Sequence, residues 1–259
     1  MRLQGKHFAS SVYMNAKSSF YSGTSGLVIP LNQSDYPPGF VGASRLNYYA
    51  SLFTSIEINS SFYKVPKVVT VEKWRKSVPE DFRFTFKVPK AVTHAKGLGF
   101  SVEEVEVFAE TVSAVGTKKG CLLVQLPPKV SREGEGELEG LLECLSGDAK
   151  GWKIAVEFRH TSWYDKGVYR MLQRYGAGMV EQDLPASPTP QVEVAENFVY
   201  LRFHGPGGRY RGSYEDAFLE SHAKWIRKWL KDGKEVYVYF NNTMGNAIGN
   251  LHTLHGFLL

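Results

Sequence analysis

Phe82-Arg83-Phe84-Thr85-Phe86-Lys87 alternates three aromatic side chains with three polar ones. Because successive side chains of a β-strand point to opposite faces, the phenylalanines share one face and Arg83, Thr85 and Lys87 share the other. Similar alternation occurs at 55–59, 154–159, 199–204 and 236–241. Helices that cover the apolar faces would produce this pattern, and half-buried antiparallel strands would also produce it.

Helical patterns separate the strand candidates along the whole chain, which favours parallel strands joined by helices. We expect strands at 20–24, 55–59, 82–87, 121–126, 154–158, 177–183, 198–204 and 236–241. We expect helices near 44–53, 69–77, 102–115, 135–146, 162–175, 215–232 and 245–256. The segment 184–197 is too rich in proline for a helix. The sequence therefore predicts an α/β protein, a (β/α)8 TIM-type barrel in a single domain over 20–259, with a degraded connection near 184–197 and an extension at 1–19.

The composition is close to that of globular proteins and excludes several other classes. Hydrophobic residues make up 43% of the 259 residues and charged residues 22%, which argues against disorder, collagen and coiled coil. The two cysteines, Cys121 and Cys144, argue against a disulfide framework and for a reducing compartment. Because no apolar stretch has the length of a signal peptide or a membrane span, we expect a cytoplasmic protein without a membrane partner.

The net charge of +5 is unevenly distributed. Residues 1–100 hold 13 Lys and Arg against 5 Asp and Glu, whereas residues 101–259 hold 18 against 21. Most of the excess falls in the stretch 64–96, which contains Lys64, Lys67, Lys73, Arg75, Lys76, Arg83, Lys87, Lys90 and Lys96. Such a stretch attracts phosphates or nucleic acid, and it is equally consistent with a solvated basic face.

Polar residues gather at the carboxyl ends of the predicted strands, where barrel enzymes carry their active sites. These ends offer Glu57, Asn59, Lys87, Gln125, Glu157, Arg159, Asp183, Arg202, His204, Asn241 and Asn242. Buried charges need partners. One interpretation is therefore an internal network, with ion pairs such as Glu57–Lys87 or Glu157–Arg202, that closes the barrel without catalysis. The other interpretation is an active site.

Glu57 and Glu157 lie on predicted strands far apart around the barrel, so they can face each other across a ligand. General acid and base catalysis needs such a pair of carboxyl groups with different protonation states. A glycosidase would use the same pair, with aromatic residues such as Trp163 as sugar platforms.

A metal site is a further alternative, because Asp183, His204 and His94 could join the two glutamates as ligands. The cationic side chains of Lys87, Arg159 and Arg202 favour an anionic ligand instead, so we predict no metal, and the sequence identifies no cofactor.

Two loops suggest phosphate. Gly205-Pro206-Gly207-Gly208-Arg209-Tyr210-Arg211-Gly212 offers backbone N–H groups beside two guanidinium groups. Asn241-Asn242-Thr243-Met244-Gly245 precedes the last predicted helix, whose N-terminus favours an anion. Barrels often bind phosphate with their last two loops. Glycines that only form a tight turn explain the first loop equally well.

Several motifs occur together and in order along the chain. They are Gly23-Thr24-Ser25-Gly26, Ser55–Tyr63, Phe86-Lys87-Val88-Pro89 with Thr93-His94, Gln125-Leu126-Pro127-Pro128, Val156-Glu157-Phe158-Arg159-His160 with Ser162-Trp163, Tyr200-Arg202-His204-Gly205 and Phe240-Asn241-Asn242. With these motifs, residues 20–258 resemble the YecE-like family, a domain of unknown function. The resemblance implies a TIM-type barrel but no agreed reaction. At fold level it implies similarity to endonuclease IV and xylose isomerase relatives, which suggests nucleic-acid binding by analogy alone.

The leading hypothesis is a barrel enzyme, a hydrolase or lyase, that acts on a small or polymeric phosphate-bearing substrate. Its predicted catalytic residues are Glu57, Glu157 and His204. Its predicted substrate-binding residues are Lys87, His94, Gln125, Arg159, Trp163, Asp183, Arg202, Gly207, Gly208, Arg209, Tyr239, Asn241 and Asn242. The alternatives are a nucleic-acid-binding barrel, in which the stretch 64–96 follows phosphates, and a glycosidase-like or metal-dependent barrel.

Overall fold

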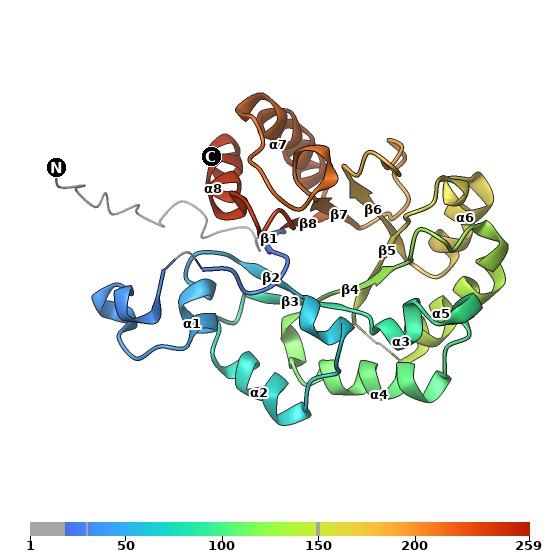
Figure 1. The fold of residues 1–259 in the computed structure, drawn as a ribbon, viewed down its shortest axis with the longest axis horizontal. Coiled ribbons are helices and arrows are strands. Elements are labelled where there is room, and N and C mark those ends of the chain that lie inside the picture. Colours follow the sequence, from blue (N-terminus) through green and yellow to red (C-terminus); the bar gives the residue numbers. More distant parts are fainter. Residues whose placement is uncertain (1–18, 30, 149–150) are drawn as a thin grey trace.

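The computed structural model describes residues 19–29, 31–148 and 151–259, and its parallel strands form one eight-stranded sheet rolled into a barrel (Figure 1). The strands are β1 Phe20–Thr24, β2 Ser55–Ile58, β3 Arg83–Lys87, β4 Lys119–Gln125, β5 Lys153–Glu157, β6 Gly178–Gln182, β7 Phe198–Phe203 and β8 Glu235–Phe240. The strand order β1-β8-β7-β6-β5-β4-β3-β2 is that of a TIM-type barrel. The predicted (β/α)8 barrel is confirmed, whereas the predicted extension at 1–19 lies outside the described residues except for Ser19.

The barrel closes where β1 approaches β2. Ser25 forms a parallel β-bridge with Glu57, and the N–H of Gly26 donates to the carbonyl of Glu57 at 2.7 Å. Gly23 permits this approach, because a Cβ atom at that position would lie 1.9 Å from the carbonyl oxygen of Ser55. The closure brings the side chains of Ser25 and Glu57 together at the mouth of the barrel.

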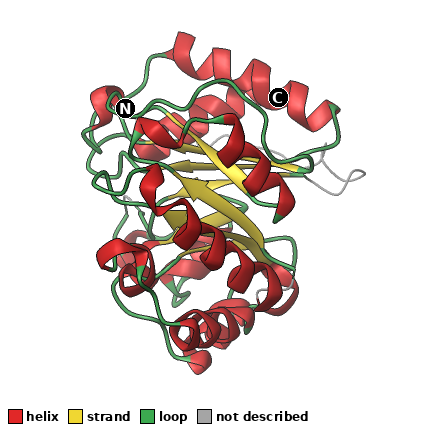
Figure 2. Ribbon diagram, turned by 90° about the vertical axis from the view of Figure 1, so that its right-hand side faces the viewer, coloured by secondary structure: helices red, strands yellow, loops and turns green. Residues whose placement is uncertain are grey.

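Helices surround the strands, as Figures 1 and 2 show. They are α1 Arg45–Ala50, α2 Val68–Lys76, α3 Lys90–Thr93, α4 Val102–Ser113, α5 Glu135–Asp148, α6 Lys166–Arg174, α7 Asp216–Lys231 and α8 Ala247–Leu258. The apolar strand faces pack beneath them: Phe82, Phe84 and Phe86 are at most 1% exposed and belong to the main core. The prediction that these aromatic side chains face the helices is therefore confirmed.

The predicted degraded connection is also confirmed. No helix interrupts residues 183–197 between β6 and β7, whereas every other pair of consecutive strands is joined through at least one α-helix. The segment is held against β6 by Thr189, whose hydroxyl donates to the carbonyl of Val180 at 2.8 Å and accepts from the N–H of Gln182 at 3.1 Å. The outer face of β6 is thus covered by a loop.

Two helices differ from the prediction. The helix expected at 162–175 begins later, at Lys166, because the Asp165 side chain accepts from the N–H of Gly167 and caps it there. The short helix α3 was not predicted, and it begins directly after Pro89. At the strands the observed and predicted ends differ by at most two residues, and β1 agrees at both ends.

Inside the barrel, aromatic side chains form a floor below the mouth. Tyr200, Tyr237 and Tyr239 are fully buried, and they pack with smaller apolar residues of β4, β5 and β6. The Tyr239 hydroxyl lies 2.6 Å from Ser55 Oγ and 2.7 Å from Thr85 Oγ1. Because the floor is packed and satisfied, the charged groups above it form a separate layer at the mouth.

Cys121 is a free cysteine and is buried in the barrel interior. Within the described part of the chain, no helix combines the length and the apolar character needed to cross a membrane.

We predict that Gly23→Ala destabilises the barrel, because the new methyl group would collide with the β2 backbone. Overpacking of this kind lowers the free energy of unfolding by about 3 kcal/mol. Gly140→Ala in the middle of α5 is the matched control, since its Cβ would meet its nearest neighbour only at 4.0 Å. It should raise stability by about 0.5–1 kcal/mol. Urea unfolding measures both, and an unchanged midpoint for Gly23→Ala would contradict this account of closure.

Candidate functional site at the mouth of the barrel

Arg202 of β7 lies at the centre of the charged layer. Its Nε and Nη2 atoms donate to the Glu57 carboxylate at 2.9–3.2 Å, and its Nη1 donates to Glu157 Oε2 at 2.8 Å. Glu57 also accepts from the hydroxyls of Ser25 and Tyr200. The side chains of Arg202, Glu57 and Glu157 are at most 2% exposed. One guanidinium group thus joins carboxylates from opposite sides of the barrel, β2 and β5.

Glu157 holds a second guanidinium group. Its Oε1 accepts from Nε and Nη2 of Arg159, which follows β5. Burial acts to raise the pKa of Glu157, but Arg202 and Arg159 outweigh burial and hold that pKa well below its usual range. Glu157 is therefore an anion at neutral pH, which suits it to orient guanidinium groups and not to donate a proton.

His204 contacts the guanidinium groups of both arginines. Its Nδ1 is 3.2 Å from Asp183 Oδ1, and its Nε2 is 3.2 Å from both Arg202 Nη1 and Arg159 Nη2. Because a guanidinium group only donates, Nε2 accepts and Nδ1 carries the hydrogen toward Asp183. Burial lowers the pKa of His204, although Glu157 and Asp183 act to raise it. The imidazole is therefore neutral, in a single tautomer.

Asp183 anchors His204 from the end of β6. Its Oδ1 accepts from the backbone N–H of His204 at 2.8 Å, and its Oδ2 accepts from the Tyr214 hydroxyl. The network therefore extends from β2 across the barrel to the segment after β7.

A cavity of about 210 Å³ lies at the mouth, above the network. It is lined by Asn59, Phe62, Tyr63, Lys87, Gln125, Arg159, Arg202, Tyr210 and Asn241. Lys87 Nζ donates to Gln125 Oε1 at 2.8 Å and lies 4.1 Å from the centroid of the Phe62 ring. Burial and the charge of Arg202 lower the pKa of Lys87 to about 8. The Lys87 amine can therefore gain and lose a proton near neutral pH.

The predicted mouth residues largely come together. The ion pair Glu157–Arg202 that the sequence suggested is present, whereas Lys87 is hydrogen-bonded to Gln125 and not to Glu57. The two glutamates are thus paired with guanidinium groups in a buried network, and cationic side chains line the cavity beside it. The residues that meet in this network or line the cavity are Glu57, Lys87, Gln125, Glu157, Arg159, Asp183, Arg202, His204 and Asn241.

Three other predicted residues lie elsewhere. Trp163 is fully buried, stacks on Phe158 and donates its indole N–H to the carbonyl of Val130 at 2.8 Å, so it belongs to the core. Tyr239 belongs to the aromatic floor below the network. His94 lines a separate cavity of about 470 Å³ that shares Phe62 and Tyr63 with the mouth cavity.

The two predicted phosphate loops reach the cavity through Tyr210 and Asn241. Gly207, Gly208, Arg209 and Asn242 are not among the residues that line it. The N–H groups of Gly208 and Tyr210 donate within the loop, to the carbonyls of Gly205 and His204.

Asn242 is fully buried, and its Nδ2 donates to the carbonyl of Gly212 at 3.0 Å. Gly205 has a φ of +90°, and a Cβ there would lie 2.4 Å from the carbonyl oxygen of Arg211. These contacts favour the interpretation of the first loop as a tight turn.

The predicted site residues do not include Asn59, Phe62 and Tyr63 of the cavity wall, nor Ser25, Tyr200 and Tyr210. Ser25 lies in Gly23-Thr24-Ser25-Gly26, one of the motifs that resemble the YecE-like family. Tyr200 lies on the same strand face as Arg202. The motif and the alternation of side chains could therefore have identified these two residues. Tyr210 lies in the predicted phosphate loop, but its position over the network depends on a backbone φ of +60°, which the sequence does not indicate. That conformation sets its ring 5.7 Å from the His204 ring and its hydroxyl 3.2 Å from Arg159 Nη1.

The described residues contain no cluster of three or more His, Cys, Asp and Glu side chains able to hold a metal ion. Glu57 and Glu157, which belong to the metal-site alternative, are paired with guanidinium groups.

Fold and mouth together define a (β/α)8 barrel with an arginine–carboxylate network beneath a small cationic cavity. The chain belongs to the family described as "Protein of unknown function DUF72", whose model matches residues 21–258. It is 28% identical to the UPF0759 protein YunF of Bacillus subtilis over 244 residues, which are 83% of this chain and 86% of that protein. It is 32% identical to the UPF0759 protein YecE of Escherichia coli K12 over 127 residues, 49% of this chain and 46% of YecE.

Solved structures share the fold. A DUF72 family protein from Enterococcus faecalis superposes with a TM-score of 0.76 at 23% identity, covering 92% of this chain and 95% of its own. A DUF72 family protein from Thermotoga maritima gives a TM-score of 0.73 at 27% identity, with 91% and 96% covered. The resemblance to the YecE-like family is confirmed.

We predict that Arg202→Met lowers the free energy of unfolding by about 3–5 kcal/mol at neutral pH, because two buried carboxylates lose their common partner. The deficit should shrink on acidification. Without the Arg202 guanidinium group, only Arg159 and His204 still oppose the burial that acts to raise the pKa of Glu157, so ionised Glu157 adds less stability at neutral pH in the variant than in the wild type. In the wild type the pKa is lowered, so Glu157 adds stability that is lost as pH falls.

Urea unfolding at several pH values measures both effects. Arg174→Met is the control, because its ion pair with Glu139 leaves the Arg174 side chain 63% exposed and such pairs contribute little. Equal stability of Arg202→Met and Arg174→Met would contradict a central role for Arg202.

Proposed function

We propose that this barrel is an enzyme, a hydrolase or a lyase, that acts on a small phosphate-bearing substrate at the mouth. The observation that carries the proposal is the convergence of Lys87, Arg159 and Arg202 on one cavity of about 210 Å³. Cationic side chains around so small a space favour a dianion over a metal ion or a neutral sugar. Since typical ligand pockets measure roughly 300–1,000 Å³, the cavity suits a phosphate with a short organic group.

Arg159 is the side chain best placed to bind a phosphate oxygen. It lines the cavity, it is 11% exposed, and its Nη1 now donates to the hydroxyl of Tyr210, which a ligand oxygen can replace. Glu157 and His204 fix the other atoms of the guanidinium group. We assign Glu57 and Glu157 to positioning Arg202 and Arg159, in place of the acid and base roles expected from the sequence.

Lys87 is the candidate acid–base group. A pKa of about 8 lies near neutral pH, where a general acid or base is most effective. Its neutral amine would take a proton from the substrate or from an attacking water, and the resulting ammonium group would return it to the leaving group. Gln125 and the Phe62 ring hold the amine on the cavity wall.

We predict that sulfate, a dianion of constant charge, binds the mouth and that its affinity falls severalfold between about pH 7 and about pH 9. The pKa of Lys87 is lowered to about 8, so the ammonium charge that attracts the anion is lost over this range. Isothermal titration calorimetry measures the affinity. Lys87→Met should bind sulfate weakly at every pH, and it should lack turnover of any phosphate monoester that the wild type converts in a substrate screen.

Lys73→Met, at an exposed position on α2, is the matched control and should behave as wild type. A wild type that binds no sulfate, or a Lys87→Met variant with unchanged affinity and pH dependence, would exclude the proposed dianion site.

A second candidate function is nucleic-acid binding, and the exposure of Tyr63 favours it. Tyr63 is 82% exposed at the rim of the mouth cavity. Lys64 and Lys90 line the adjoining cavity of about 470 Å³. An exposed aromatic ring beside two ammonium groups can stack on a base while the lysines contact phosphates.

If this second function holds, Tyr63→Ala weakens binding of a single-stranded RNA or DNA oligonucleotide by about 1–3 kcal/mol, the usual contribution of one stacked base. Lys90→Met should reduce the slope of log affinity against log salt by about 0.7, whereas Lys224→Met on α7 should leave it unchanged. Fluorescence anisotropy at several salt concentrations measures both effects. An affinity that does not change with salt concentration would reject this function.

A further inference from the structure

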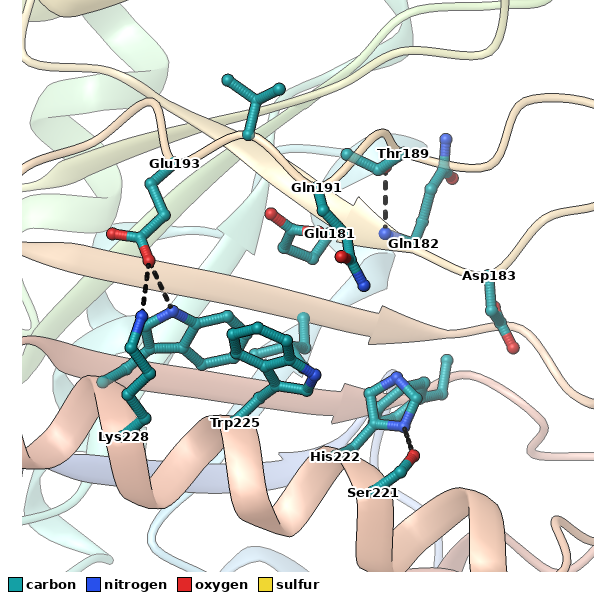
Figure 3. A pocket seen from close by; sticks show the side chains of 14 residues that line it. Glu181, Gln182, Asp183, Thr189, Gln191, Glu193, Ser221, His222, Trp225 and Lys228 are labelled. Atoms are coloured by element: carbon teal, nitrogen blue, oxygen red, sulfur yellow. Dashed lines mark hydrogen bonds and ion pairs between the residues drawn. The ribbon is translucent and has the colours of Figure 1, made fainter.

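Another cavity lies on the flank of the barrel, where the helix between β6 and β7 is missing. This flank cavity has a volume of about 460 Å³, within the usual range of small-molecule pockets. Its walls are β6, β7, the segment 183–197 and α7 (Figure 3). It is lined by Glu181, Gln182, Asp183, Thr189, Gln191, Val192, Glu193, Leu201, Phe203, Ser221, His222, Trp225, Lys228 and Trp229.

Glu181 is the unexplained group of this cavity. Its side chain points outward from β6, on the face that carries apolar side chains in the other strands. In a complete (β/α)8 barrel a helix would cover this face, and here the carboxyl group of Glu181 lines the cavity. Among the described residues, no hydrogen bond or ion pair reaches its carboxyl group. Burial, with the nearby charge of Glu193, raises the pKa of Glu181 to about 7. Glu181 is half-buried, and a carboxyl group that loses contact with water without gaining a partner is costly, so a ligand could supply that partner.

Aromatic side chains of α7 form the opposite wall. The rings of Trp225 and Trp229 stack with centroids 6.0 Å apart, and Trp225 is 43% exposed. Figure 3 shows Trp225 and His222 on the helix facing Glu181 and Gln191 across the cavity. The wall therefore offers a flat apolar surface to a ring.

His222 adds a second hydrogen-bond acceptor. Its Nδ1 lies 2.8 Å from the carbonyl oxygen of Phe218, and because a carbonyl only accepts, Nδ1 carries the hydrogen. Burial lowers the pKa of His222, so the imidazole is neutral and Nε2 is an acceptor. Glu181 and His222 both suit a ligand that donates hydrogen bonds.

We propose that the flank cavity binds a small organic cation, an ammonium or amidinium group carried on an aromatic or similarly flat apolar ring. The cation would pair with Glu181, and the ring would lie against Trp225. Three carboxylates, Glu181, Asp183 and Glu193, line the cavity against the single ammonium group of Lys228, so the charge of its walls favours a cation over an anion. Indole rings add attraction for an ammonium or amidinium group.

The other two carboxylates that line the cavity already accept hydrogen bonds from protein groups. Glu193 accepts from Lys234 Nζ at 2.6 Å and from the indole N–H of Trp229 at 3.2 Å. Asp183 accepts from His204 and Tyr214 at the mouth. Glu181 is thus the carboxyl group available to a ligand. Because Asp183 also lines the flank cavity, a ligand there lies beside the residue that orients His204.

The charged and titratable groups that face Glu181 come from four elements. They are His222 and Lys228 of α7, Glu193 of the segment 183–197, Asp183 at the end of β6, and Tyr169 of α6. Of these, the pKa of Glu193 is lowered by hydrogen bonds from Lys234 and the pKa of Tyr169 is raised by burial. These shifts move both groups away from neutral pH, so the charge of Glu181 dominates any change between about pH 6 and pH 8.

The test uses the full chain and 2-phenylethylamine, with 2-phenylethanol as its uncharged isostere. Calorimetry should show the ammonium compound binding about tenfold more tightly than the alcohol at about pH 8. A carboxyl group with a pKa of about 7 gains its charge between about pH 6 and pH 8, so affinity should rise about tenfold over this range. The indole N–H signals of Trp225 and Trp229 in proton–nitrogen NMR spectra should shift on binding.

Glu181→Gln should lose about tenfold in affinity and show no pH dependence. Trp225→Leu, at an exposed position where folding is not at risk, should weaken binding severalfold. Glu196→Gln, an exposed carboxyl group outside the cavity, is the matched control and should bind as wild type. Lys87→Met should also bind as wild type, which separates this proposal from the one made for the mouth.

Three results would overturn the proposal. They are equal affinity for the amine and the alcohol, a Glu181→Gln variant with the affinity and pH profile of the wild type, and indole signals that stay unchanged at saturating amine.

Discussion

The interaction on which the mouth of this barrel depends is the contact of one buried guanidinium group, that of Arg202, with two buried carboxylates. Removing such charges from water is costly, and only mutual pairing with further hydrogen bonds offsets that cost. Ser25, Tyr200 and Arg159 supply those bonds. The network in turn connects β2, β5 and β7, so the charge of the site and the closure of the barrel share the same contacts.

This arrangement also decides which groups remain available for chemistry. Glu57 and Glu157 are saturated with donors, and His204 is fixed between Asp183 and the two guanidinium groups. Lys87 stands apart, because its partners are a neutral amide and an aromatic face. Burial and the nearby positive charge of Arg202 lower the pKa of the Lys87 amine to about 8. The network thus leaves the cavity with cationic walls and with an amine whose pKa is lowered to about 8.

The missing helix between β6 and β7 has a different consequence. In a (β/α)8 barrel each strand face is normally covered by a helix. Here a loop covers β6, and a cavity of about 460 Å³ remains beside it, larger than the one at the mouth. Asp183 belongs to both places, since it lines the flank cavity and holds His204. The degraded connection therefore leaves a cavity that borders the network of the mouth.

The sequence by itself determined the fold and the layer in which the site lies, because alternation along strands such as 82–87 assigns each side chain to a face whatever its distant neighbours are. It also placed Glu157 and Arg202 on inward faces. Only the tertiary structure decided which inward residues touch. The place of Trp163 in the core, the internal hydrogen bonds of the loop 205–212, and the turn that sets Tyr210 over His204 depend on contacts between residues far apart in the chain. The alternation of side chains along a strand carries no information about such contacts. The face on which each side chain lies was therefore predictable, and the contacts between side chains at the mouth were not.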